Sequence, residues 1–128
     1  MVILDTSIII DQLRRPPKES YLFKLAQKLS KESFALSVLS VQELYGDQST
    51  RDTRREELML ATISPLKILP YTFEVSQLAG EIIRDLGRPI EFVDAAIAAS
   101  AIVNGYQLAT LNKKDFIGIK DLEILTTL

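Results

Sequence analysis

The fold-deciding stretch is Val2-Ile3-Leu4-Asp5-Thr6-Ser7, in which an apolar triplet is followed directly by an acid and two hydroxyl residues. The triplet is typical of a short buried strand, and Thr6 or Ser7 is suited to cap the helix that follows. That helix carries an apolar run at residues 8–10 and ends before Pro16-Pro17. The opening of the chain therefore predicts a strand, a turn and a helix.

The same alternation continues along the chain, as judged from hydrophobic periodicity and turn residues. Further strands are predicted at 34–38, 66–69 and 106–110, with a last short strand at 122–125. Helices are predicted at 22–29, after Ser40, and at 51–62, 72–87 and 92–103. Thr72 is expected to cap the 72–87 helix and Gly87 to end it. Strands that alternate with helices predict an α/β sandwich with a mainly parallel central sheet.

Composition limits both the architecture and the chemistry. With 128 residues, 47% of them hydrophobic, the chain has the size of one domain, expected to cover 1–128. The absence of cysteine removes disulfides and thiolate chemistry and favours a cytoplasmic location. The absence of histidine excludes serine-histidine and cysteine-histidine hydrolases and leaves oxygen ligands, which suit magnesium or manganese. The chain start lacks a basic signal-peptide region, and no apolar stretch is long enough to span a bilayer, so no membrane association is expected.

The net charge of −2 argues against a basic coat for nucleic acid, although basic residues do form local clusters. Such clusters are more often solvated surface than binding sites, and they gain interest only around an acidic centre. The candidates for contact with a nucleic-acid backbone are Arg14, Arg15, Arg51, Arg54, Lys113 and Lys114.

Four acidic residues, Asp5, Glu43, Asp94 and Asp115, each follow or interrupt an apolar run. In a parallel sheet, ligands bind at the carboxyl ends of the strands, which is where Asp5 is expected. If the other three meet there, their carboxylates repel one another unless a cation joins them. The set therefore points to metal-dependent chemistry.

Taken singly, most of these residues also have a structural explanation. Asp5 would favour the helix N-terminus that follows it, and Asp115 fits a loop or cap. Glu43 completes a capping box with Ser40. Asp94 is harder to explain this way, because it shares a helix face with apolar residues and an unpaired buried carboxylate is costly.

The chain closely resembles the PIN-domain nucleases, and among them the VapC-like toxins of prokaryotic toxin-antitoxin systems. The resemblance rests on an opening Asp-Thr-Ser at 5–7, Ser-x-x-Glu at 40–43, an Asp-x-x-Ile-Ala-Ala-like segment at 94–99, and Thr-x-Asn-x-x-Asp-Phe at 110–116. No single string is decisive, but their order and spacing are specific, and they run nearly from end to end.

The resemblance implies a three-layer α/β/α fold and a metal-dependent endoribonuclease, a hydrolase that cleaves RNA. It implies catalysis and ligation of Mg²⁺ or Mn²⁺, directly or through water, by Asp5, Glu43, Asp94 and Asp115. Asn112 and Asp115 compete for the last position, where Asp115 is favoured as ligand. Supporting roles fall to Thr6, Ser7, Thr110 and Asn112. The implied partners are RNA, a cognate antitoxin whose segment blocks the acidic pocket, and a second copy in a homodimer.

Two other classes compete with this interpretation. Phosphoryl transfer through an aspartyl intermediate, as in haloacid-dehalogenase-like phosphatases or response-regulator receivers, requires Asp-x-Asp or an acidic pair near the first strand, which Asp5-Thr6-Ser7 lacks. A catalytically silent PIN-like module that binds protein or RNA remains the alternative, and the intact acidic set weighs against it.

Overall fold

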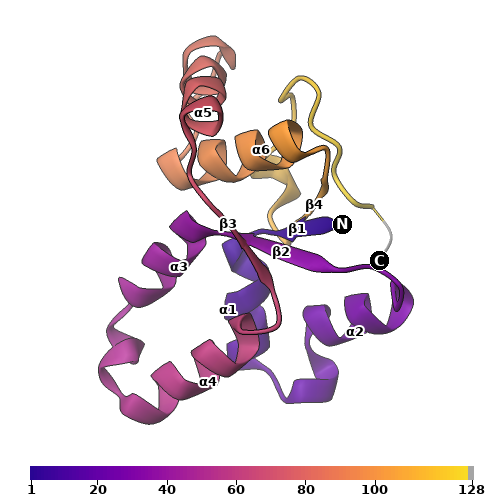
Figure 1. Cartoon of the computed structure of the whole chain (residues 1–128), viewed down its shortest axis with the longest axis vertical. Coiled ribbons are helices and arrows are strands. Elements are labelled where there is room, and N and C mark those ends of the chain that lie inside the picture. Colours follow the sequence, from indigo (N-terminus) through magenta and orange to yellow (C-terminus); the bar gives the residue numbers. More distant parts are fainter. Residues whose placement is uncertain (127–128) are drawn as a thin grey trace.

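A central parallel sheet organises the computed structural model, which describes residues 1–126 (Figure 1). The last two residues of the predicted 1–128 domain, Thr127 and Leu128, lie outside the described part. The strands are β1 (Val2–Leu4), β2 (Phe34–Ser37), β3 (Lys67–Leu69) and β4 (Gln107–Ala109). Their order is β3-β2-β1-β4, and every neighbouring pair is parallel. The carboxyl ends of all four strands therefore lie along the same edge of the sheet.

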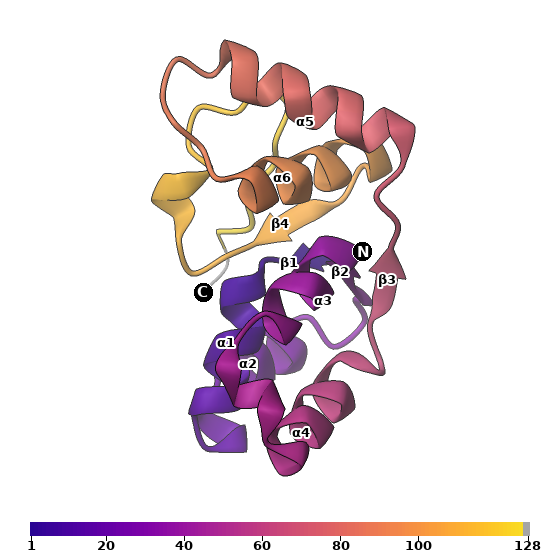
Figure 2. The same ribbon diagram turned by 90° about the vertical axis from the view of Figure 1, so that its left-hand side faces the viewer.

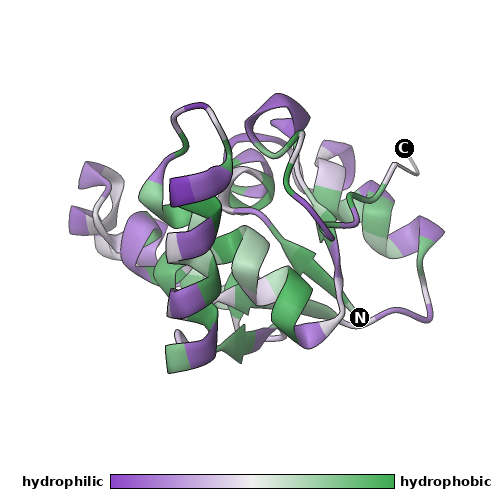
Figure 3. Cartoon of the chain, turned by 90° about the horizontal axis from the view of Figure 1, so that it is seen from above, coloured by the Kyte–Doolittle hydropathy of each residue, from purple (hydrophilic) through white to green (hydrophobic). Residues whose placement is uncertain are grey.

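The first strand occupies an interior position and packs on both faces of the sheet. Val2 and Leu4 contact a core cluster that includes Ile8 of the following helix, whereas Ile3 faces the opposite cluster with Ile97. All three strand residues are buried, as an apolar triplet without polar alternation predicts. Figure 3 shows the strands as hydrophobic, while the surrounding helices alternate hydrophobic and hydrophilic residues.

Helices cover both faces of the sheet and complete three layers (Figure 2). α1 (Thr6–Arg14), α2 (Tyr21–Lys28) and α4 (Thr53–Ile63) lie on one side. α5 (Phe73–Asp85) and α6 (Phe92–Asn104) lie on the other. α3 (Val38–Tyr45) continues directly from β2, and three short 3₁₀ helices complete the fold: η1 (Pro17–Glu19), η2 (Gln48–Arg51) and η3 (Lys113–Asp115). The predicted α/β/α sandwich is confirmed.

The two helices of the second layer follow their sequence signals. In α5, Thr72 accepts a hydrogen bond from the Val75 amide, and Gly87 adopts a left-handed φ of 80° just after the helix, as predicted. In α6, the alanine-rich run 95–101 is buried throughout, because small side chains let the helix approach the sheet closely. Within residues 1–126, no helix is long and apolar enough to cross a membrane.

Three details differ from the sequence predictions. α3 begins at Val38 with Ser37 as its cap, so Ser40 lies inside the helix, where its hydroxyl accepts a hydrogen bond from Thr6 instead of forming a capping box. The residue before α1 is Asp5, not Thr6 or Ser7, and its side chain makes no capping bond. The predicted strand at 122–125 is reduced to one bridge between Leu108 and Ile124.

Candidate active site

An acidic hollow of about 1180 Å³ opens at the carboxyl ends of β1 and β4. The four acids singled out from the sequence reach its wall from four segments distant in sequence: the β1–α1 junction, α3, the start of α6 and the loop after β4. Its acidic lining residues are Asp5, Glu43, Asp47, Glu91, Asp94 and Asp115. All four acidic residues singled out from the sequence thus line the same hollow.

Asp5 is the most firmly held of these acids. Its side chain is only 4% exposed, and its Oδ2 accepts hydrogen bonds from the Ser7 hydroxyl at 2.7 Å and the Thr110 hydroxyl at 2.7 Å. The Asp5 amide also donates to the Ala109 carbonyl at 2.9 Å, extending the β1–β4 pairing past the end of the strand. The orientation of Asp5 is therefore set from both ends of the chain.

Asp94 lies in the first turn of α6 and is only partly buried. Burial makes the largest contribution to raising its pKa to about 7, and the neighbouring charges of Asp5, Asp115, Glu43 and Glu91 supply the rest. The electrostatic influence of the other acids agrees with their shared place on the wall of the hollow. A carboxyl group with this pKa is half protonated near neutral pH and gains most from a cation.

Glu43 and Asp115 line the hollow from different elements. Glu43 is exposed on α3, while Asp115 ends η3 and is partly buried. Asp115 also lines a smaller hollow of about 390 Å³ together with Arg88, Glu91 and Asp94. The two hollows share Glu91, Asp94 and Asp115, so they are adjoining parts of one acidic region.

The residues predicted to support the site take different positions. Ser7 and Thr110 both donate to Asp5, and the Leu111 amide donates to the Ser7 hydroxyl at 3.3 Å. Asn112 lines the hollow, and its backbone amide donates to the Thr110 hydroxyl at 2.9 Å. Thr6 also lines the hollow, but its hydroxyl donates to Ser40 at 2.8 Å, which ties α1 to α3.

Two charged residues that line the smaller hollow beside Asp94 and Asp115 were missed by the sequence interpretation. Glu91 precedes α6 and contributes to the raised pKa of Asp94. Arg88 lines the smaller hollow and reaches the loop that carries Asp115. The position of Glu91, three residues before Asp94, was a sequence signal that could have identified it. Nothing local links Arg88 to Asp115, because the contact spans 27 residues.

The donor chemistry of this region fits a hard divalent cation. The acidic residues supply carboxylate oxygens, the chain has no histidine or cysteine, and oxygen ligands are those that Mg²⁺ and Mn²⁺ prefer. The mutual repulsion that raises the pKa of Asp94 is of the kind a cation relieves. Within residues 1–126, no three acidic side chains already form a preassembled cage. The fit therefore rests on the donor set and its shared hollow.

Comparison with known proteins agrees with the fold and the motifs. Residues 2–122 match the PIN domain family model. Ribonuclease VapC1 from Rickettsia felis is 33% identical over 132 residues, covering 98% of this chain and 95% of that protein. Ribonuclease VapC10 from Mycobacterium tuberculosis is 32% identical, with coverage of 88% and 83%. The crystal structure of DNA-bound VapBC from Salmonella typhimurium superposes with a TM-score of 0.84 at 25% identity, covering 97% and 96%. The chain therefore belongs to the PIN-domain family, among the members that resemble the VapC ribonucleases.

Proposed function

We propose that residues 1–128 form a single divalent-metal-dependent endoribonuclease domain, the toxin component of a VapBC-type system. The observation that carries the proposal is the meeting of Asp5, Glu43, Asp94 and Asp115, from four separate segments, around one hollow. The full-length similarity to proteins named as ribonucleases gives the substrate class. Because that substrate is RNA, the proposed place of action is the cytoplasm. A silent binding module is not favoured, because such a module has no need of the complete acidic set.

The four carboxylates are the proposed ligands of Mg²⁺ or Mn²⁺, directly or through water. The chemistry that such a cation supplies when bound is activation of water and neutralisation of charge on the phosphate. Asp5 is held by two hydroxyl groups and provides the fixed reference point for binding. Asp94, whose pKa is raised to about 7 by burial and the neighbouring acids, is the carboxylate whose ionised form a cation would favour most. Asn112 and Thr110 keep the loop after β4 in place.

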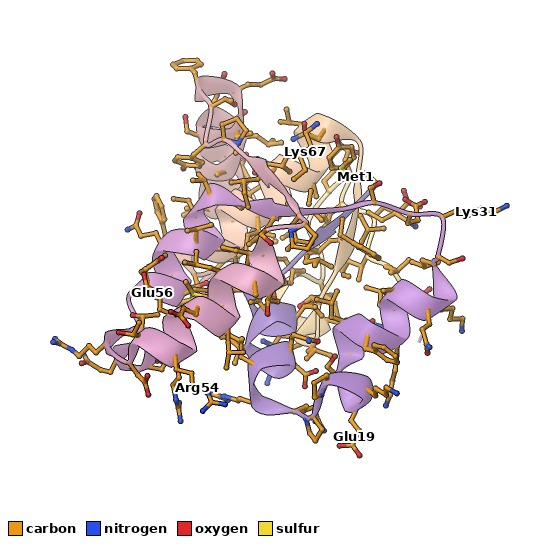
Figure 4. The ribbon with its side chains drawn as sticks, turned by 60° about the horizontal axis from the view of Figure 1, so that its bottom comes forward. Met1, Glu19, Lys31, Arg54, Glu56 and Lys67 are labelled. Atoms are coloured by element: carbon orange, nitrogen blue, oxygen red, sulfur yellow. The ribbon has the colours of Figure 1, made fainter. Side chains whose placement is uncertain are left out.

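The charge around the hollow bears on how RNA would approach it. Without a cation, the acidic wall repels phosphate, so substrate binding is expected to require metal. Of the basic candidates named from the sequence, Arg14 lines the hollow. Arg55, which was not among those candidates, lines it as well. Arg54 instead extends from α4 away from the sheet (Figure 4). Arg14 and Arg55 are therefore the better candidates for contact with the RNA backbone.

The proposed protein partners are a cognate antitoxin and a second copy of the chain. Structures of relatives were determined as VapBC complexes, which supports an antitoxin partner here. Beside the acids, the larger hollow has an apolar wall suited to a bound antitoxin segment: Ile10, Leu13, Leu44, Leu58 and Met59. The homodimer is proposed from the family resemblance alone.

Cleavage of end-labelled RNA by the purified protein tests the function. With Mg²⁺ or Mn²⁺ we expect specific cuts, which chelation abolishes. Asp5→Asn and Asp94→Asn should each lower the rate at least about 100-fold, as loss of a group that supports transition-state charge does. Asp85→Asn, which removes an exposed acid paired with Arg84 on α5, is the matched control and should keep the wild-type rate. Metal-independent cleavage, or equal rates in all four proteins, would reject the proposed mechanism and site.

A further inference from the structure

Arg88 connects two loops that carry acids of the site. It lies between α5 and α6, and its Nη2 donates to the carbonyl oxygen of Ile117 at 2.6 Å and to that of Asp115 at 3.2 Å. Its Nη1 also donates to the Pro89 carbonyl at 3.5 Å, which holds the guanidinium against its own loop. One side chain thus joins the segment leading to Asp94 with the segment containing Asp115.

The segment containing Asp115 has little else to fix it on its outer side. Phe116 is 1% exposed and anchors the segment from the core, but Ile117 is 61% exposed and contributes little packing. The regular structure there is limited to η3, whose end is closed by the bond from the Phe116 amide to the Lys113 carbonyl. Ile119 is 7% exposed and packs in the same core cluster as Phe116, so the segment between these two anchors is the part that the hydrogen bonds from Arg88 hold in place.

The chemistry of Arg88 suits this task. Among residues 1–126, no carboxylate lies within salt-bridge distance of its guanidinium, so its donors are directed at backbone carbonyls. A guanidinium presents several donors in a rigid fork, which fixes the relative position of two acceptors better than an ammonium group can. Arg88 also lines the smaller hollow with Asp94 and Asp115, and its bonds to the Pro89 and Asp115 carbonyls link the backbone that leads to one acid with the backbone that carries the other.

We infer that Arg88 is a positioning residue, which sets the distance of Asp115 from Asp94 and thereby the affinity of the acidic hollow for a divalent cation. The inference rests on the proposed function, because it assigns Asp115 a part in holding that cation. Outer groups that orient metal ligands typically contribute about 10- to 100-fold in metal affinity or activity. The contribution of Arg88 should therefore be visible in metal binding itself, without RNA.

Calorimetric titration of Mn²⁺ into the purified protein tests the inference. Arg88→Ala should weaken Mn²⁺ binding about 10-fold or more. The matched control is Arg84→Ala, which removes the same charge from an exposed residue paired with Asp85, and it should bind Mn²⁺ as the wild type does. Arg88→Lys keeps the charge but loses the fork, and should recover only part of the affinity. Full recovery by lysine, or equal affinity in Arg88→Ala and Arg84→Ala, would overturn the inference.

A double-mutant cycle with Asp115→Asn separates positioning from a general effect on the fold. If Arg88 acts through Asp115, Arg88→Ala should change Mn²⁺ affinity less than about two-fold in the Asp115→Asn background, because the two effects are not additive. Additive effects would overturn the inference. Should Arg88→Ala fail to fold, as judged by thermal unfolding, Arg88→Lys enters the same cycle. A wild type that neither binds Mn²⁺ nor cleaves RNA would reject the proposed function itself, a result distinct from failure of the Arg88 variants alone.

Discussion

Asp5 and Asp94 face the same hollow, but the fold holds them in opposite ways. Asp5 is 4% exposed and accepts two short hydrogen bonds from hydroxyl groups, one of them 105 residues away in sequence. Asp94 has no hydrogen-bond partner for its carboxylate in the described part of the chain, and burial together with the surrounding acids raises its pKa to about 7. The fold thus solvates one charge internally and leaves the other unsatisfied.

Under the proposed function, this difference would let the site be rigid and still bind a cation. A carboxylate with its own donors keeps its orientation whether or not an ion is present. A desolvated carboxylate among like charges costs free energy in the folded state, and a cation that binds there recovers this energy. Under this proposal, Asp5 would supply the geometry of the site, and Asp94 would supply much of the driving force for cation binding.

Among changes that leave both acids in place, the largest effect is expected from Thr110→Val, which removes one of the two donors to Asp5 with little change in side-chain shape. It also deprives the Asn112 amide of its acceptor. RNA cleavage should fall about 10- to 100-fold, as with other groups that orient metal ligands. The free energy of unfolding should drop by about 1–3 kcal/mol, because buried polar groups lose a partner.

Thr62→Val is the matched control for this change. The Thr62 hydroxyl donates to the Leu58 carbonyl on the exposed face of α4, far in sequence from the acids. Cleavage by Thr62→Val should equal that of the wild type. A Thr110→Val protein that also cleaves at the wild-type rate would show that Asp5 does not need its hydroxyl donors, and the contrast with Asp94 would lose its meaning.

The sequence was informative wherever the signal is local or repeats along the chain. The uninterrupted triplet 2–4 predicted a strand buried on both faces, and Thr72 and Gly87 predicted the ends of α5, because these depend on neighbouring residues only. The parallel sheet followed from the alternation of strands and helices. A parallel sheet brings strand ends together, so the meeting of distant acids in one hollow also followed.

The features that the sequence did not reveal depend on contacts between distant residues. Ser40 and Glu43 have the spacing of a capping box, but the contact of Ser40 with Thr6, 34 residues away, places it inside α3 instead. The contact between Arg88 and the Asp115 carbonyl spans 27 residues and involves backbone atoms, which carry no residue-specific signal. Local rules cannot rank such contacts before the fold is known.

An effect of intermediate size is expected from Asp94. It should make the stability of the metal-free protein depend on pH. Its pKa is about 7 in the folded protein against 3.8 as the ordinary value, so between these two pH values the folded state holds a proton that the unfolded state has lost. The melting temperature of the metal-free protein should therefore fall as pH rises from about 4 to about 7. Asp11, Asp47 and Asp85 have lowered pKa values and titrate below this range.

Calorimetry between about pH 4 and pH 8.5 checks this dependence, with Asp94→Asn as the reference. The variant lacks the titrating group and should show a flatter profile and a higher melting temperature than the wild type at pH 8. Added Mg²⁺ should raise the melting temperature of the wild type most above pH 7, where Asp94 is ionised. A wild-type profile as flat as that of Asp94→Asn would mean that Asp94 is not desolvated as described.

The smallest effect is expected at Asp11, a carboxylate that is held by donors as Asp5 is but is not among the residues that line the hollow. Burial opposes its ionisation, yet hydrogen bonds from the Tyr21 amide, at 2.8 Å, and from Arg15 outweigh burial and lower its pKa. Asp11→Ala should lower the free energy of unfolding by about 1–2 kcal/mol, because the first turn of α2 loses an acceptor. The loss should disappear as pH falls below the lowered pKa of Asp11, where its stabilising charge is absent in the wild type too.

Urea unfolding of Asp11→Ala checks the predicted loss of stability. The control is Asp85→Ala, which removes an exposed acid and is expected to show no measurable change. RNA cleavage should stay unchanged in Asp11→Ala. If Asp11→Ala also abolished cleavage, then firmly held carboxylates would matter for the fold as a whole, and the special place of Asp5 in the site would not follow from its hydrogen bonds.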